Sequence, residues 1–138
     1  MIEERQIIFH GQYFKDFYIG VSNKVKEKIG YVFRVIKSVA MVSEKFLKHV
    51  SGTDGLYEIR VEDSGNIYRI FCCFDKGNVV VLFNAFEKKT QKTPKPEIEF
   101  ALKLKKEYFT LKEKQNVERN KTKQGTKKEQ GDKKRKKF

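Results

Sequence analysis

Three strand-like runs follow one another in the middle of this chain with only short turns between them. In the first run, Tyr57, Ile59 and Val61 alternate with polar residues, which is the two-residue period of a strand with one buried face. The turn sequences DSGN at 63–66 and DKGN at 75–78 separate it from two further apolar runs. Because such turns join antiparallel neighbours, the sequence predicts a three-stranded antiparallel meander.

The segments on either side of the meander complete the expected fold. Arg5–His10 has the apolar centre of a short strand, and apolar spacings of three and four over Asn23–Val42 predict a helical face. Together with the segment before Gly20, this face belongs to two helices or to one helix interrupted at Gly20. Residues 46–50 look like a last helical turn or a covering loop. Thr93-Pro94 predicts the start of a final helix. We therefore expect a compact α+β fold of order β-α-α-β-β-β-α, with the helices packed on one face of the antiparallel meander.

The net charge of +13 is unevenly distributed over the 138 residues. Residues 112–138 hold 12 Lys and Arg against 4 Asp and Glu, whereas the rest of the chain holds 19 against 14. Apolar periodicity ends near Leu111, so we expect one domain over 1–111 and a basic, disordered tail over 112–138. The tail suits nonspecific binding of any polyanion, and its charge does not by itself establish nucleic-acid binding.

Several classes of protein are disfavoured by the sequence. The first residues are too few and too acidic for a secretory signal, and no apolar run has the length of a membrane span, so we expect a cytoplasmic chain. The neighbouring Cys72 and Cys73 point to opposite faces of a strand and are interpreted as packing residues in a reducing compartment. His10 and His49 have no partner ligands in a recognisable pattern, so we expect no metal and no other cofactor.

Strand parity gathers charged side chains on the face of the sheet that the predicted helices leave open. The apolar set of the first run takes the core face, which sends Glu58 and Arg60 to the other face. The same reasoning places an arginine and a phenylalanine of the second run beside them, and the third run ends in lysines. The candidate residues gathered in this way are Glu58, Arg60, Arg69, Phe71, Lys88, Lys89 and Lys92.

The segments LYEIRV, YRIFCCFDKGNVVVL and FEKKTQKTPKPEIEFA resemble the HigB-like, phage-derived branch of the RelE/ParE superfamily of toxins from type II toxin-antitoxin systems. The resemblance covers about residues 5–111. It implies a compact microbial RNase-like fold and metal-independent cleavage of messenger RNA on the ribosome, which inhibits translation. It also implies neutralisation by a small helix-turn-helix antitoxin in a toxin-antitoxin hetero-oligomer.

The resemblance also assigns residues. It matches the basic second-strand residue of RelE-type toxins to Arg60, their third-strand arginine to Arg69, and the basic group after the last strand to Lys88 or Lys89. RelE itself has a further basic residue where this chain has Glu58, and its tyrosine near the carboxyl terminus has no secure match here.

RNA cleavage without a metal needs a base for the 2′-hydroxyl, charge stabilisation at the phosphate and a proton for the leaving oxygen. Arginine forks suit the phosphate, while either Glu58 or one of the lysines Lys88, Lys89 and Lys92 suits the base. The candidate RNA-binding residues are Lys92, Phe71, Phe86 and Lys95, of which the aromatic rings would stack on bases.

Two other functions stay open at this point. The ParE branch of the same superfamily poisons DNA gyrase, which would break DNA and leave transcripts intact. A non-enzymatic module would bind nucleic acid through its basic tail and a protein partner through its sheet. The sequence leaves codon preference and the identity of the general acid and base undetermined.

Overall fold

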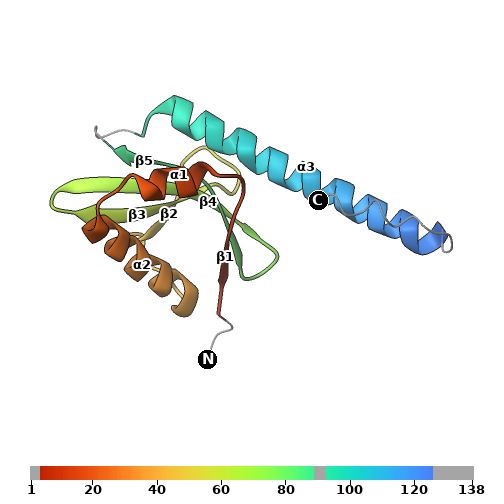
Figure 1. Ribbon diagram of the computed structural model, residues 1–138, viewed down its shortest axis with the longest axis horizontal. Coiled ribbons are helices and arrows are strands. Elements are labelled where there is room, and N and C mark those ends of the chain that lie inside the picture. Colours follow the sequence, from red (N-terminus) through yellow and green to blue (C-terminus); the bar gives the residue numbers. More distant parts are fainter. Residues whose placement is uncertain (1–3, 89–92, 126–138) are drawn as a thin grey trace. The chain divides into compact units, whose positions relative to one another are not determined.

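The computed structural model describes the backbone of residues 4–88 and 93–125, and side chains as far as residue 118 (Figure 1). Its elements are, in chain order, β1 (Gln6–Phe9), α1 (Tyr13–Ile19), α2 (Asn23–Ser38), β2 (Leu47–His49), β3 (Tyr57–Asp63), β4 (Asn66–Asp75), β5 (Val79–Lys88) and α3 (Lys95–Gly125). The α+β class and the two helices divided at Gly20 agree with the sequence prediction.

The five strands form one mixed sheet in the order β1-β5-β4-β3-β2. The predicted meander is confirmed as β3, β4 and β5, which pair antiparallel. One expectation about the sheet is wrong. Residues 47–49 form the edge strand β2 instead of a helical turn or a loop, because three residues are too few to show a period. Strand β1, for which the sequence predicts no partner, pairs parallel with β5.

One face of the sheet packs against α1 and α2. The buried face of α2 consists of Val25, Ile29, Val32 and Ile36, and it meets alternate residues of β3 and β4 such as Ile59 and Ile70. Ser22 accepts a hydrogen bond from the backbone N–H of Val25 at the start of α2. At the other end, the Arg5 guanidinium donates to the carbonyl of Ile36 in the last turn and to those of Val39 and Ala40 just beyond it. Side chains therefore supply hydrogen-bond partners for backbone groups at both ends of α2.

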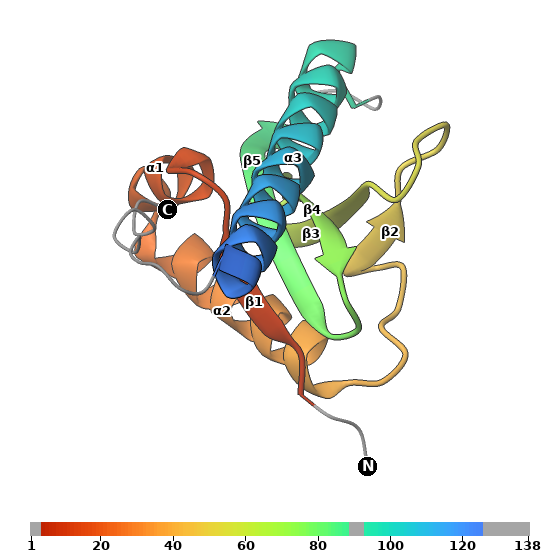
Figure 2. The same cartoon turned by 90° about the vertical axis from the view of Figure 1, so that its right-hand side faces the viewer.

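The other face of the sheet is covered as well, by the first turns of α3 (Figure 2). Ala101 and Leu104 are buried on that side, and the Asn84 amide donates to the carbonyl oxygen and the Oε1 of Glu97. The expectation that the helices pack on one face is therefore wrong. The near-continuous apolar sequence of β4 and β5 is typical of strands buried on both faces, and Phe71, Cys73, Val81 and Phe83 are fully buried on the second face.

A β-bulge interrupts the pairing of β4 with β5. Ile70 lies opposite Ala85 but Cys72 lies opposite Leu82, so Phe83 and Asn84 together face the single residue between them, Phe71. The extra residue reverses the parity of β5 beyond this point. Side chains at 86 and 88 consequently lie on the face that a regular strand would give to 85 and 87.

Helix α3 continues to Gly125, so the prediction that ordered structure ends at Leu111 is wrong. Lys, Glu and Gln are good helix formers, which explains why the helix continues beyond Leu111 although no apolar stripe follows there. The chain divides into two compact units at Lys105/Lys106, and the described part of the second is this continuation of α3. The expected division into a domain over 1–111 and a tail remains a prediction, and residues 126–138 lie outside the described residues.

Candidate active site

The centre of the predicted site is a row of three side chains across the middle of the sheet. Arg60 on β3 lies directly opposite Arg69 on β4, which lies directly opposite Phe86 on β5. Directly opposed residues of antiparallel strands share a face, so these three side chains lie on the α3 side of the sheet. Glu58 precedes Arg60 on the same face, and Lys88 follows Phe86 there because of the bulge.

Glu58 and Arg69 form a buried ion pair in which the Arg69 Nη1 donates to the Glu58 Oε2. The two side chains retain 7% and 5% of their exposure, so this part of the predicted open face is closed. The pKa of Arg69 is lowered, chiefly by burial and also by the Arg60 charge, although Glu58 opposes the shift. The Arg69 Nε is buried and has no acceptor among the described residues, which leaves one strong donor unused.

Lys88 is half-buried, and the electrostatic surroundings of its ammonium are mostly positive. Its pKa lies below the ordinary value of 10.5, first because of burial and then because of repulsion from Arg69, Arg60 and Lys48, while Glu58 opposes the shift. A lowered pKa makes the neutral amine more accessible, and the neutral amine is the form that accepts a proton.

The two aromatic candidates differ in accessibility. Phe71 and Phe86 lie with ring centroids 5.7 Å apart, but Phe71 is 0% exposed. The interpretation of Phe71 as a stacking surface for a base is therefore wrong, because no part of its ring is accessible to a base. Phe86 is only half-buried and lies directly opposite Arg69.

Lys48 is a residue of the cluster that the sequence reasoning missed. It lies on β2 directly opposite Glu58, is exposed, and contributes to the lowered pKa of Lys88. Nothing in a three-residue strand distinguishes it from a loop lysine. The polar Asn84 interrupts the apolar run VVVLFNAF, and the bulge of β5 lies at this position.

The remaining predicted lysines are not brought into the described cluster. Lys89 and Lys92 lie outside the described residues. Lys95 is exposed at the first residue of α3. Among the described residues, no group of three or more His, Cys, Asp or Glu is placed to hold a metal ion.

Residues 16–106 match the family model described as phage-derived protein Gp49-like (DUF891). The chain belongs to the Gp49-like family. This family is part of the RelE/HigB-like toxin superfamily. No curated protein matches the chain.

The Gp49-like match includes every described residue of the cluster, from Lys48 to Lys88, and ends beside the boundary between the two compact units. Membership of a phage-derived family in this superfamily is compatible with a toxin of a toxin-antitoxin system. None of the described helices combines the length and the apolar character that crossing a membrane requires.

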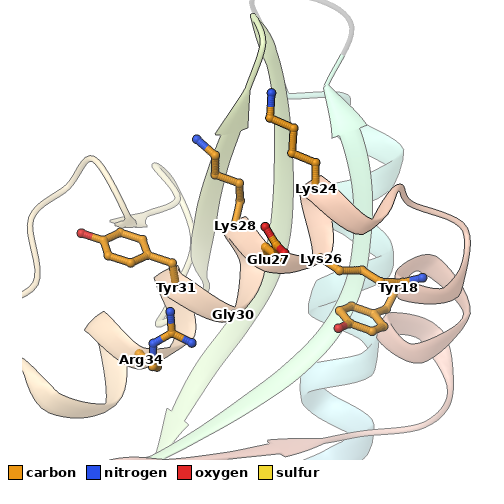
Figure 3. A pocket seen from close by; sticks show the side chains of 8 residues that line it. All are labelled: Tyr18, Lys24, Lys26, Glu27, Lys28, Gly30, Tyr31 and Arg34. Atoms are coloured by element: carbon orange, nitrogen blue, oxygen red, sulfur yellow. The ribbon is translucent and has the colours of Figure 1, made fainter.

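A second basic surface of this Gp49-like protein lies along the exposed side of α2. A shallow hollow of about 670 Å³ there is lined by Tyr18, Lys24, Lys26, Glu27, Lys28, Gly30, Tyr31 and Arg34 (Figure 3). None of these residues is buried, and Lys24 pairs with Asp63 while Lys26 lies over the Tyr18 ring. The hollow is thus a solvated basic face, whereas the cluster on the sheet contains buried, electrostatically perturbed groups.

Proposed function

We propose that this Gp49-like protein is the toxin of a type II toxin-antitoxin system and acts as a metal-independent endoribonuclease that cleaves messenger RNA on the ribosome. The observation that carries the proposal is the cation cluster, in which the bulge of β5 brings Lys88 to the same face as Arg60 and Arg69. Phosphate is the substrate group that such a cluster both binds and activates.

Arg60 is the principal phosphate ligand in this proposal. It is half-buried and lies beside Arg69, and a guanidinium fork matches two phosphate oxygens while keeping its charge. Arg69 is held by Glu58 and has its Nε unused, so it adds positive potential and one further donor. Phe86 offers an apolar surface for a neighbouring base.

Lys88 is the proposed base. Its lowered pKa favours it over Glu58, because the Glu58 carboxylate is buried and already accepts a hydrogen bond from Arg69. The amine takes the proton of the 2′-hydroxyl, the 2′-oxygen attacks the adjacent phosphorus, and the bond to the 5′-oxygen breaks. The products are a 2′,3′-cyclic phosphate and a 5′-hydroxyl, whose proton comes from a general acid or from water.

The partners follow from the same proposal. The ribosome presents the messenger, and a helix-turn-helix antitoxin holds the toxin inactive in a hetero-oligomer. An enzyme of this kind depends on the ribosome for part of its geometry, so cleavage of naked RNA is not its diagnostic assay.

The test is primer extension on cellular transcripts after brief induction of the wild type, Arg60→Ala, Lys88→Ala and the control Lys103→Ala. Arg60 and Lys88 are better probes than Arg69, whose removal would leave Glu58 buried and unpaired. Lys103 is exposed on α3 and matches the charge change without belonging to the cluster.

New 5′ ends within translated regions are expected for the wild type and the control, and their loss is expected in both cluster variants. Growth arrest with broken DNA and intact transcripts would refute the proposal in favour of gyrase inhibition. New ends that persist in folded Arg60→Ala and Lys88→Ala proteins would refute the assignment of the site.

A further inference from the structure

The position where Arg69 would meet a phosphate is already occupied by a carboxylate of the protein itself. Glu58 accepts a hydrogen bond from the Arg69 Nη1, and both side chains are almost fully buried. A carboxylate presents two oxygens to a guanidinium much as a phosphate does, so Glu58 competes with any anion that approaches Arg69. Displacing it without another partner would leave a buried, unpaired charge.

The structure provides such a partner on the neighbouring strand. Lys48 lies directly opposite Glu58 in the β2–β3 register, and Cβ atoms in that relation are about 5 Å apart. The Lys48 side chain is exposed and forms no ion pair with Glu58 in this structure. A flexible ammonium next to a carboxylate that is bound elsewhere is positioned to receive it.

We propose that Lys48 is a positioning residue, which accepts the Glu58 carboxylate when an RNA phosphate displaces it from Arg69. The inference rests on the proposed function and deepens it, because it defines how RNA gains access to the site. In the free protein Glu58 pairs with Arg69, and in the complex Arg69 pairs with the phosphate and Glu58 with Lys48. The unused Nε of Arg69 then has an acceptor as well.

The exchange makes a different prediction from direct binding of phosphate by Lys48. If Lys48 acts through Glu58, Lys48→Ala weakens RNA binding by about fivefold to tenfold in the wild type, the size of one typical hydrogen bond in a protein. In a Glu58→Gln background the competing charge is gone. RNA then binds more tightly than to the wild type, and Lys48→Ala has less than a twofold effect. A direct contact would instead give the same loss in both backgrounds.

The experiment is a double-mutant cycle on the full chain, with affinity measured for a short single-stranded RNA that carries 2′-O-methyl groups and cannot be cleaved. The four proteins are the wild type, Lys48→Ala, Glu58→Gln and the double variant, with Lys48→Arg as the conservative rescue and Lys103→Ala as the charge-matched control. Coupling between Lys48 and Glu58 supports the exchange, and strictly additive changes in the free energy of RNA binding overturn it.

Glu58→Gln alters a buried pair, so a second measurement uses the wild-type protein alone. The ¹³C resonance of the Glu58 carboxyl carbon is followed by NMR while the same RNA is added. A shift that saturates with binding supports the exchange, and an unchanged resonance at saturation overturns it. Failure of the proposed function is recognised separately, because primer extension after induction of the wild type would then show no new 5′ ends within translated regions.

Discussion

Replacing Arg69 by alanine is expected to destabilise the fold strongly, because it leaves the Glu58 carboxylate buried without its partner. The two side chains keep 5% and 7% of their exposure, which places the pair in the class whose disruption costs about 3–5 kcal/mol. For a domain near 100 residues, 1 kcal/mol corresponds to at least about 4 °C, so the midpoint of thermal unfolding should fall by about 12 °C or more. Circular dichroism with urea and with heat measures both quantities.

Two further proteins make this test specific. In Glu58→Leu/Arg69→Met both charges are replaced by apolar groups of similar volume, so most of the lost stability should return. Lys24→Ala breaks the Lys24–Asp63 pair, in which the lysine is 67% exposed and the atoms are 3.7 Å apart, and it should cost less than about 1 kcal/mol. A loss below about 1 kcal/mol for Arg69→Ala, or a double variant no more stable than the single one, would contradict the reasoning.

Three other outcomes are expected. Because the pKa of Lys88 is lower in the folded protein, the unfolded chain binds more protons, and this residue makes the free energy of unfolding rise with pH up to the ordinary lysine pKa of 10.5. Arg60→Gln removes one of the repelling charges, so it should raise the pKa of Lys88 in an NMR titration. An unchanged pKa would show that the two cations do not interact. Gly65 has φ +84° with open space where a Cβ would lie, so Gly65→Ala should cost about 1 kcal/mol through backbone strain alone, measurable by urea unfolding. Burial raises the pKa of Cys73 to about 11, so iodoacetamide at pH 8 should label this thiol only as fast as the chain unfolds, and rapid labelling of folded protein would refute that.

The parts of the fold that depend on neighbouring residues were predictable from the sequence. The DSGN turn is confirmed, with Asp63 opposite Asn66 and positive φ at Ser64 and Gly65. The side-chain parity of β3 and β4, which places Arg60 and Arg69 on one face, is also confirmed. These features depend on a two-residue period and on turn chemistry, and both are visible in a few consecutive residues.

The parts that depend on distant segments were not predictable in the same way. Lys88 reaches the face of Arg69 through a one-residue bulge, and the burial of Glu58 and Arg69 depends on a second packed layer that local pattern does not reveal. Lys48 belongs to a strand that exists through its pairing with β3 and has no pattern of its own. Sequence therefore gives the identity of the charged residues more reliably than their accessibility.

The parallel pairing of β1 with β5 has a consequence for the synthesis of the protein. Gln6 is made early but pairs with Val79, and Lys88, the last described member of the cluster, ends the same strand that β1 needs. A nascent chain that stops before β5 has neither a closed sheet nor a complete cluster, because pairing between residues so far apart in sequence must wait for both. For a protein proposed to attack messenger RNA on ribosomes, the nascent chain therefore lacks the complete cation cluster until β5 has been translated.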